Sequence, residues 1–177
     1  QLFNIDKRHT NSSSDTEMLL NVFATELQEQ IHTKDLQPEI IFNAVETLHK
    51  RIQGSYASIA LISGHGLLAF RDPFGIRPLV IGKRISQKTQ KEEWMVASES
   101  LVLENNDYQV VRDVEPGEAI FITYNGEFFS KQCSENPKLF PCAFEYVYLA
   151  RPDSVMNGIS VYKARLKMGD YLAETIK

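Results

Sequence analysis

The sequence predicts an α+β fold with antiparallel sheets, and three observations lead to it. Two stretches with helical spacing of apolar residues come first, many short strand-like runs joined by tight turns follow, and a last helical stretch ends the chain. Consecutive strands joined by hairpins pair antiparallel, whereas parallel strands need a long crossover between them. The 177 residues, of which 43% are hydrophobic, suffice for one folding unit with a buried core.

The first helix is expected to begin at Ser14 and to run to about residue 31. Ser14 and Glu17 have the spacing of a capping box, in which each side chain binds the other residue's backbone amide. Asp15 lies in the first turn, where a carboxylate suits the helix dipole, and this role alone can explain it. Apolar residues at intervals of three and four form one stripe for a core: Leu19, Val22, Phe23 and Leu27.

The second helix is expected to begin near Pro38, a residue that suits the first helical turn, and Gly54 is expected to end it. Its apolar stripe consists of Ile41, Ala44, Val45, Leu48 and Ile52. Each of the two helices therefore offers one face to a core.

Seven short apolar runs bounded by turn residues then predict strands, at residues 56–62, 67–70, 79–82, 94–97, 110–114, 118–123 and 127–130. Asn125-Gly126 predicts a two-residue hairpin, and residues 63–66 predict another turn between strands. His65, between two glycines of that turn, is expected to face solvent rather than to act as a base. Residues 98–100 are expected to cap a short helical turn.

The segment Arg-Asp-Pro-Phe-Gly-Ile-Arg-Pro-Leu, at residues 71–79, is expected to join two strands by a tight connection. Its prolines fix φ, and its glycine can take a positive φ. Arg71, Asp72 and Arg77 could form an internal ion-pair network or an anion site. The network is the favoured interpretation, because arginine–carboxylate pairs commonly brace turns.

Residues 144–154 are the most distinctive stretch of the chain. The first half alternates aromatic and aliphatic residues, which predicts a buried strand, and the second half, Arg-Pro-Asp-Ser, predicts a polar turn. A last helix is expected from about Val161, with Leu166, Met168 and Leu172 available for packing.

Composition narrows the possible functions. The net charge is −4 with no basic run, which argues against nucleic acid or an anionic membrane surface as a partner, and no apolar run reaches the ~20 residues of a membrane span. The two cysteines, Cys133 and Cys142, suit a reducing cytoplasm better than a disulfide scaffold. The sequence has no glycine-rich phosphate motif, serine nucleophile elbow or metal-binding pattern, so the residues alone give no complete catalytic constellation.

Five motifs together resemble the amidophosphoribosyltransferase family along essentially the whole chain. They lie at residues 11–17, 71–79, 97–100, 116–118 and 144–154. The resemblance implies an N-terminal-nucleophile hydrolase fold, an αββα sandwich with antiparallel sheets. It also implies that residues 1–150 are the later part of a class II glutamine amidotransferase domain, and that residues 151–177 are the junction and first helix toward a phosphoribosyltransferase domain.

In that family an N-terminal cysteine releases ammonia from glutamine, and a channel carries it to phosphoribosyl pyrophosphate, where Mg²⁺ is present. The product, 5-phosphoribosylamine, opens purine synthesis. The chain has neither that cysteine nor the transferase domain, and both of its ends look cut. We therefore expect a segment that is inactive alone and binds no cofactor, from a cytoplasmic protein that is a homo-oligomer.

By resemblance, Asp15 matches the aspartate that binds the α-ammonium group of glutamine. Phe144 and Tyr148 fall where the family lines its ammonia channel, although core packing is a rival explanation for Phe144. Cys142 aligns with a position that ligates an iron–sulfur cluster in some members, but a plain buried thiol is the favoured interpretation. Two alternatives stay open: another class II glutamine amidotransferase, or a non-catalytic module that keeps the fold.

Overall fold

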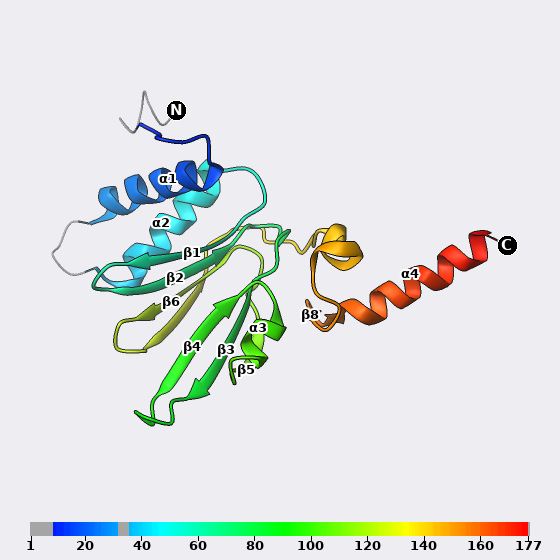
Figure 1. The fold of residues 1–177 in the computed structure, drawn as a ribbon. Helices are drawn as coiled ribbons and strands as arrows, with labels where there is room; N and C mark the ends of the chain where they lie inside the picture. Colours follow the sequence, from blue (N-terminus) through cyan, green and yellow to red (C-terminus); the bar gives the residue numbers. More distant parts are fainter. Residues whose placement is uncertain (1–8, 32–35, 177) are drawn as a thin grey trace.

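A computed structural model describes residues 9–31 and 36–176, and its layers are those of an α+β sandwich (Figure 1). Helices α1 (Asp15–Gln30) and α2 (Pro38–Arg51) cover one face of a four-stranded sheet, and a three-stranded sheet lies against the other face. The short helix α3 (Ser100–Glu104) packs on the far side of the second sheet. The order of layers is therefore helices, sheet, sheet and helix.

All pairings in the two sheets are antiparallel, as predicted. The four-stranded sheet has the order β1-β2-β6-β7, with strands β1 (Ala57–Ile62), β2 (Gly66–Arg71), β6 (Glu118–Thr123) and β7 (Phe128–Gln132). The three-stranded sheet has the order β4-β3-β5, with strands β3 (Val80–Ile85), β4 (Glu92–Ala97) and β5 (Gln109–Asp113).

Alternation along the strands builds a core on each face of the larger sheet. Leu68 and Phe70 of β2 point to the helices, where they pack with the buried stripes of α1 and α2. Ala69, between them in sequence, points to the second sheet and packs with Leu79 and Ile81. The central strands are therefore buried on both faces, which explains why they read as continuous apolar runs.

The cap of α1 differs from the predicted capping box. Ser14 is the N-cap residue, but its side chain makes no capping hydrogen bond. The Glu17 carboxylate reaches back past it and accepts hydrogen bonds from the backbone amides of Asn11 (2.7 Å) and Ser12 (2.8 Å), and from the Ser12 hydroxyl (2.6 Å). The preceding polar loop offers three donors in place of one, so the carboxylate holds that loop against the start of the helix.

The prediction of a strand at the start of residues 144–154 is wrong. Residues 145–149 form a π-helical turn, η1 (Glu145–Leu149), in which the Ala150 amide donates to the Glu145 carbonyl (3.0 Å). Within residues 144–150 only Glu145, Tyr146 and Ala150 are buried, and no strand among the described residues pairs with them. A short apolar run does not by itself distinguish a strand from a helical turn, and here the contacts with distant residues decide.

After η1 come a small hairpin and a projecting helix. Strands β8 (Val155–Met156) and β9 (Ile159–Ser160) are joined by Asn157 and Gly158, which both have positive φ (49° and 73°), as a two-residue type I′ turn requires. Helix α4 (Val161–Ile176) then extends away from the sandwich (Figure 1).

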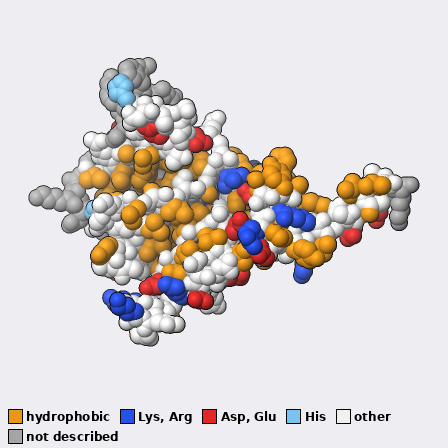
Figure 2. Space-filling model, viewed as in Figure 1, with side chains coloured by type: hydrophobic (Ala, Val, Ile, Leu, Met, Phe, Trp, Pro, Cys, Tyr) orange, Lys and Arg blue, Asp and Glu red, His pale blue; other side chains and the backbone are white. Residues whose placement is uncertain are grey.

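The outer part of α4 is not packed against the described residues. Leu166, Met168 and Leu172, which the sequence offers for packing, are exposed. The described residues therefore do not cover this apolar face of α4. Figure 2 shows hydrophobic side chains gathered along α4 and again over the edge of the four-stranded sheet, where Ile59 and Leu61 of β1 are exposed. No helix among the described residues is long and apolar enough to cross a membrane.

Candidate functional site

A cleft of about 1310 Å³ opens where the start of α1 faces the connections between the strands and η1. Its lining comes from five separate parts of the chain. They include Asp15 and Thr16 of α1, residues 51–58, Arg77 and Pro78, Ser98 and Glu99, and Glu145 and Leu149 of η1. A large concave site with converging charged groups is the default candidate for ligand binding.

Asp15 is one of the residues that line this cleft. It is the first residue of α1 and is exposed, and its Oδ1 accepts a weak hydrogen bond from the Thr16 hydroxyl (3.4 Å). The loop before it is fixed by the Glu17 carboxylate, whose pKa is lowered by the hydrogen bonds from Asn11 and Ser12. The carboxylate of Asp15 is therefore presented to the cleft on an anchored helix start, a geometry in which it can accept hydrogen bonds from a cationic ligand.

The β2–β3 connection, residues 71–79, is braced mainly by hydrogen bonds to the backbone. Arg71 is buried, and its guanidinium donates to the carbonyls of Gly75 (2.7 Å), Arg77 (2.8 Å) and Val114 (2.7 Å). Burial lowers the pKa of Arg71 from its usual value. Asp72 is equally buried and accepts from three backbone amides, those of Tyr56, Phe74 and Ile76.

The predicted ion-pair network is therefore only partly present. Arg71 and Asp72 each satisfy backbone groups, and the ion pair of this segment is made by Arg77, whose Nη1 lies 3.0 Å from Oε1 of Glu145. Buried carbonyls and amides need hydrogen-bond partners. A charged side chain that makes three such hydrogen bonds therefore fixes the turn more completely than a single ion pair would. The connection is thereby held rigidly at the edge of the cleft.

The segment after the cleft is fastened to the sandwich by Glu99 and Ser100, which were expected only to cap a short helical turn. The Glu99 carboxylate accepts from the Ser154 hydroxyl (2.6 Å) and from the Arg151 amide (2.9 Å). Ser100 accepts from the Val155 amide (3.0 Å). The sequence offers little signal for these contacts, because Glu99 and Ser100 also fit the start of a short helix and their partners lie more than 50 residues away.

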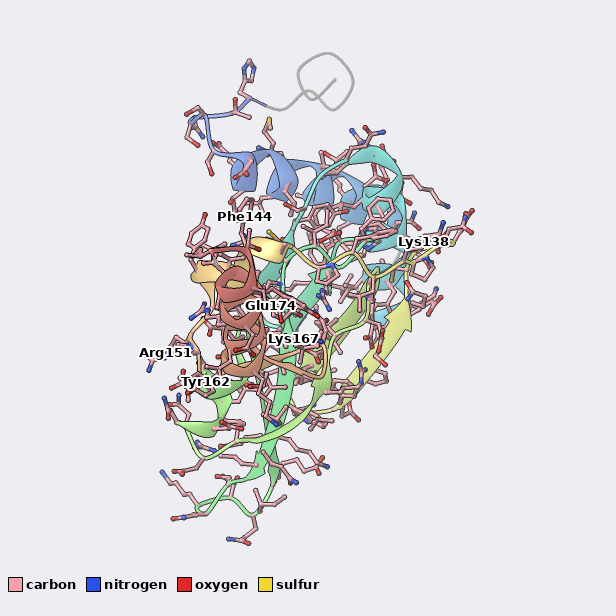
Figure 3. The ribbon with its side chains drawn as sticks, turned by 90° about the vertical axis from the view of Figure 1, so that its right-hand side faces the viewer. Lys138, Phe144, Arg151, Tyr162, Lys167 and Glu174 are labelled. Atoms are coloured by element: carbon pink, nitrogen blue, oxygen red, sulfur yellow. The ribbon has the colours of Figure 1, made fainter. Side chains whose placement is uncertain are left out.

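Phe144 and Tyr148 do not line the cleft themselves, but each precedes a residue that does, Glu145 and Leu149. Phe144 and Tyr148 form an aromatic pair with ring centroids 5.7 Å apart, and both side chains are largely exposed, at 59% and 64%. Figure 3 labels Phe144 on the side of this segment that faces α1, and Arg151 and Tyr162 toward the three-stranded sheet. Because the Phe144 side chain is exposed, packing in a core formed by the described residues does not explain this residue.

The thiols and histidines do not form a metal site within the part of the chain that the structure describes. Cys133 is buried beneath α2, and burial raises its pKa to about 12. Cys142 is a partly buried free thiol whose backbone amide donates to the Ile76 carbonyl (3.0 Å). His65 lies in the exposed turn between β1 and β2, as predicted. Among the described residues, no three His, Cys, Asp or Glu side chains are grouped to hold a metal ion.

Comparison with known proteins shows which class this fold and cleft define. Residues 3–105 match the family model of the glutamine amidotransferase domain, and the chain belongs to this family. Its similarity then extends over nearly its full length to amidophosphoribosyltransferases. It is 51% identical to that of Pasteurella multocida and to that of Escherichia coli, in each case over 99% of this chain, and 46% identical to that of Saccharomyces cerevisiae over 96%.

Solved structures give the same result. The glutamine phosphoribosylpyrophosphate amidotransferase of B. subtilis, complexed with ADP and GMP, superposes with a TM-score of 0.76 at 28% identity over 96% of this chain. The prediction of part of an N-terminal-nucleophile hydrolase sandwich with antiparallel sheets is confirmed, and so is the family resemblance. The chain spans about a third of the length of these relatives, 34% for the E. coli protein and 33% for the B. subtilis chain.

Proposed function

We propose that this chain is the later part of the glutamine-hydrolysing region of an amidophosphoribosyltransferase. The complete protein takes the amide nitrogen of glutamine, passes it as ammonia through an internal channel, and adds it to phosphoribosyl pyrophosphate to give 5-phosphoribosylamine. The observation that carries the proposal is the 51% identity over 99% of the chain to two proteins of that name. The cleft bordered by Asp15 is the feature of the structure that fits it.

In this proposal Asp15 binds the α-ammonium group of glutamine. An exposed carboxylate on an anchored helix start can accept charge-assisted hydrogen bonds from an ammonium ion, and the internal hydrogen bond that it accepts from the Thr16 hydroxyl is long at 3.4 Å. The cleft volume of about 1310 Å³ leaves room for the amino acid to extend from Asp15 toward the residues that carry out hydrolysis. Those residues, the N-terminal cysteine nucleophile among them, lie outside this chain in the proposal, so the chain alone is inactive.

Phe144 and Tyr148 form part of the channel wall in the proposal. An aromatic wall suits a channel for ammonia because it excludes the water that would protonate ammonia to ammonium. The two rings contact each other, and the described residues cover less than half of the surface of either side chain. The remaining wall, the phosphoribosyltransferase domain and its Mg²⁺ belong to further residues, with the boundary near residue 150.

The test is to measure 5-phosphoribosylamine formation by the complete protein, with glutamine and then with ammonia as the nitrogen source. Replacing Asp15→Ala should raise the KM for glutamine by about 10- to 100-fold, the loss expected for a hydrogen bond to a charged group, and leave the ammonia-dependent rate nearly unchanged. Glu104→Ala, at an exposed site on α3 and outside the cleft, is the control and should alter neither rate.

Two results would contradict these assignments. An equal loss of glutamine- and ammonia-dependent activity in Asp15→Ala would remove Asp15 from the glutamine site while leaving the activity in place. No product from either nitrogen source with the unsubstituted protein would overturn the enzymatic proposal itself and favour a non-catalytic module. Nitrogen transfer to a different acceptor would favour another class II amidotransferase.

A further inference from the structure

An ion pair in the lining of the cleft lies next in sequence to the aromatic pair of Phe144 and Tyr148. Arg77, from the rigid β2–β3 connection, contacts Glu145, the first residue of η1, at 3.0 Å, and both residues line the cleft. The Glu145 side chain is 8% exposed and its Oε1 makes no hydrogen bond among the described residues. A buried carboxylate is costly unless a positive charge faces it, so the position of Glu145 depends on Arg77.

Glu145 is placed to transmit that dependence to the aromatic pair. It follows Phe144 directly in sequence and starts the turn that carries Tyr148. Leu149, in the same turn, lines the cleft together with Glu145. Residues on one helical turn move together, because their backbone amides and carbonyls are bonded to one another. A shift at Glu145 therefore moves both aromatic rings.

The other end of η1 is fixed to the base of α4. Arg165 of α4 donates from Nε to the Tyr146 carbonyl (2.8 Å) and from Nη2 to the Ala150 carbonyl (2.6 Å). Tyr146, Ala150 and Val161 share a small hydrophobic cluster with Met156 of the hairpin. The turn η1, the hairpin and the base of α4 thus form one packed unit. Two contacts join it to the lining of the cleft: the pair of Arg77 and Glu145 next to the aromatic rings, and the hydrogen bonds of Glu99 at residues 151–154.

We infer that the Arg77–Glu145 ion pair is a positioning pair, which holds η1 so that the surface of Phe144 and Tyr148 continues from the glutamine cleft. The inference rests on the proposed function: ammonia released in the cleft then follows the aromatic surface to the acceptor instead of escaping to water. The pair touches neither the reacting bond nor the acceptor. Its loss should separate the two half-reactions, whereas a brace that only stabilises the fold would leave them coupled.

The experiment measures glutamate and 5-phosphoribosylamine in the same reaction of the complete protein. In the unsubstituted protein their ratio should lie close to one. Glu145→Gln keeps the shape but removes the charge, and Arg77→Met removes the partner. Each should raise the ratio of glutamate to phosphoribosylamine by about threefold or more. This change is modest, because displacements of about 1 Å in active sites can lower reaction rates by about 100-fold. The rate with external ammonia should stay within about twofold.

Three further variants separate positioning from stability. Glu93→Gln breaks a pair of similar length, 2.9 Å to Arg84, on the three-stranded sheet outside the cleft, and should leave the ratio unchanged. Arg77→Lys keeps a cation and should bring the ratio back toward that of the unsubstituted protein. If Glu145→Gln does not fold, Arg77→Met decides, because the Arg77 side chain is 45% exposed and its loss opens no buried cavity.

The outcomes are distinct. An unchanged ratio in Arg77→Met and Glu145→Gln, with normal coupling in the unsubstituted protein, would overturn the inference and leave the proposed function intact. A raised ratio in Glu93→Gln as well would also overturn it, because the effect would then follow from lost stability. If the unsubstituted protein forms no phosphoribosylamine from either nitrogen source, the proposed function falls and the inference falls with it.

Discussion

Glu99 and Ser154 lie 55 residues apart in the sequence and are joined by a 2.6 Å hydrogen bond, from the Ser154 hydroxyl to the Glu99 carboxylate. The same carboxylate oxygen accepts from the Arg151 amide (2.9 Å), and Ser154 is completely buried. The polar turn at residues 151–154 is thus a point of attachment between the sandwich and the segment that leads to α4. A carboxylate that accepts two hydrogen bonds fixes both the direction and the distance of that attachment.

Replacing Ser154→Ala should lower the free energy of unfolding of the chain by about 1–3 kcal/mol, because the Glu99 carboxylate loses one donor in a partly buried contact. Urea denaturation followed by circular dichroism measures this change. Ser130→Ala, at an exposed site on β7, is the control and should stay within about 0.5 kcal/mol of the unsubstituted chain. If both substitutions have the same small effect, the 2.6 Å hydrogen bond adds no net stability.

Features with a local signal were predictable from the sequence. The apolar stripes of α1 and α2 follow the helical period, and the turns at residues 63–66 and 125–126 carry the glycines that such turns need, so helices, hairpins and the antiparallel class were predicted correctly. Asp15 was selected through family resemblance, and the structure places it at the cleft. Its role there stays a prediction.

Features that depend on distant residues were not predictable in this way. The alternating pattern at residues 144–150 indicated a strand, but Arg77 holds one end of this stretch and Arg165 the other, and its amides bond within a π-helical turn. Arg71 was expected to pair with a nearby carboxylate. Its partners include the Val114 carbonyl and Asn157, 43 and 86 residues away, and no local pattern contains such information.

Asn157 combines a backbone role with a side-chain role, and two substitutions can separate them. Its φ is 49°, its Oδ1 accepts from both Nη atoms of Arg71 (3.2 Å each), and its Nδ2 donates to the Tyr146 hydroxyl (3.2 Å). Asn157→Gly removes the hydrogen bonds but keeps the turn, and should destabilise the chain by about 1–2 kcal/mol. Asn157→Ala also strains the positive φ and should cost about 1 kcal/mol more.

The same denaturation measurement compares these two variants. Gly158 supplies the other positive φ of the turn and is unchanged in both, so the difference between Asn157→Ala and Asn157→Gly isolates the backbone at residue 157. Equal stability of the two variants would show that the positive φ carries no penalty for alanine at this turn. Greater stability of either variant than of the unsubstituted chain would contradict the hydrogen-bonding role.

His49, in the last turn of α2, makes the stability of the chain depend on pH. Its Nδ1 lies 2.7 Å from the Tyr56 hydroxyl, and burial lowers its pKa to about 4. The helix C-terminus favours the charged imidazole by about 0.3–1 kcal/mol, less than the burial that opposes it. Between pH 6.5 and pH 4 the unfolded chain therefore takes up a proton that the folded chain does not.

The contribution of His49 is fully present above pH 6.5 and is lost as the pH falls toward 4, by up to about 3 kcal/mol. Urea denaturation at pH 7.5 and pH 4.5 should therefore show a smaller loss of stability for His49→Gln than for the unsubstituted chain, since glutamine can still bond the Tyr56 hydroxyl but does not titrate. His65→Gln, which replaces an exposed imidazole, should keep the original pH dependence. Equal losses in the His49 and His65 variants would mean that burial of His49 does not control this titration. Of these two imidazoles, only that of His49 packs against the buried rings of Tyr56 and Phe70.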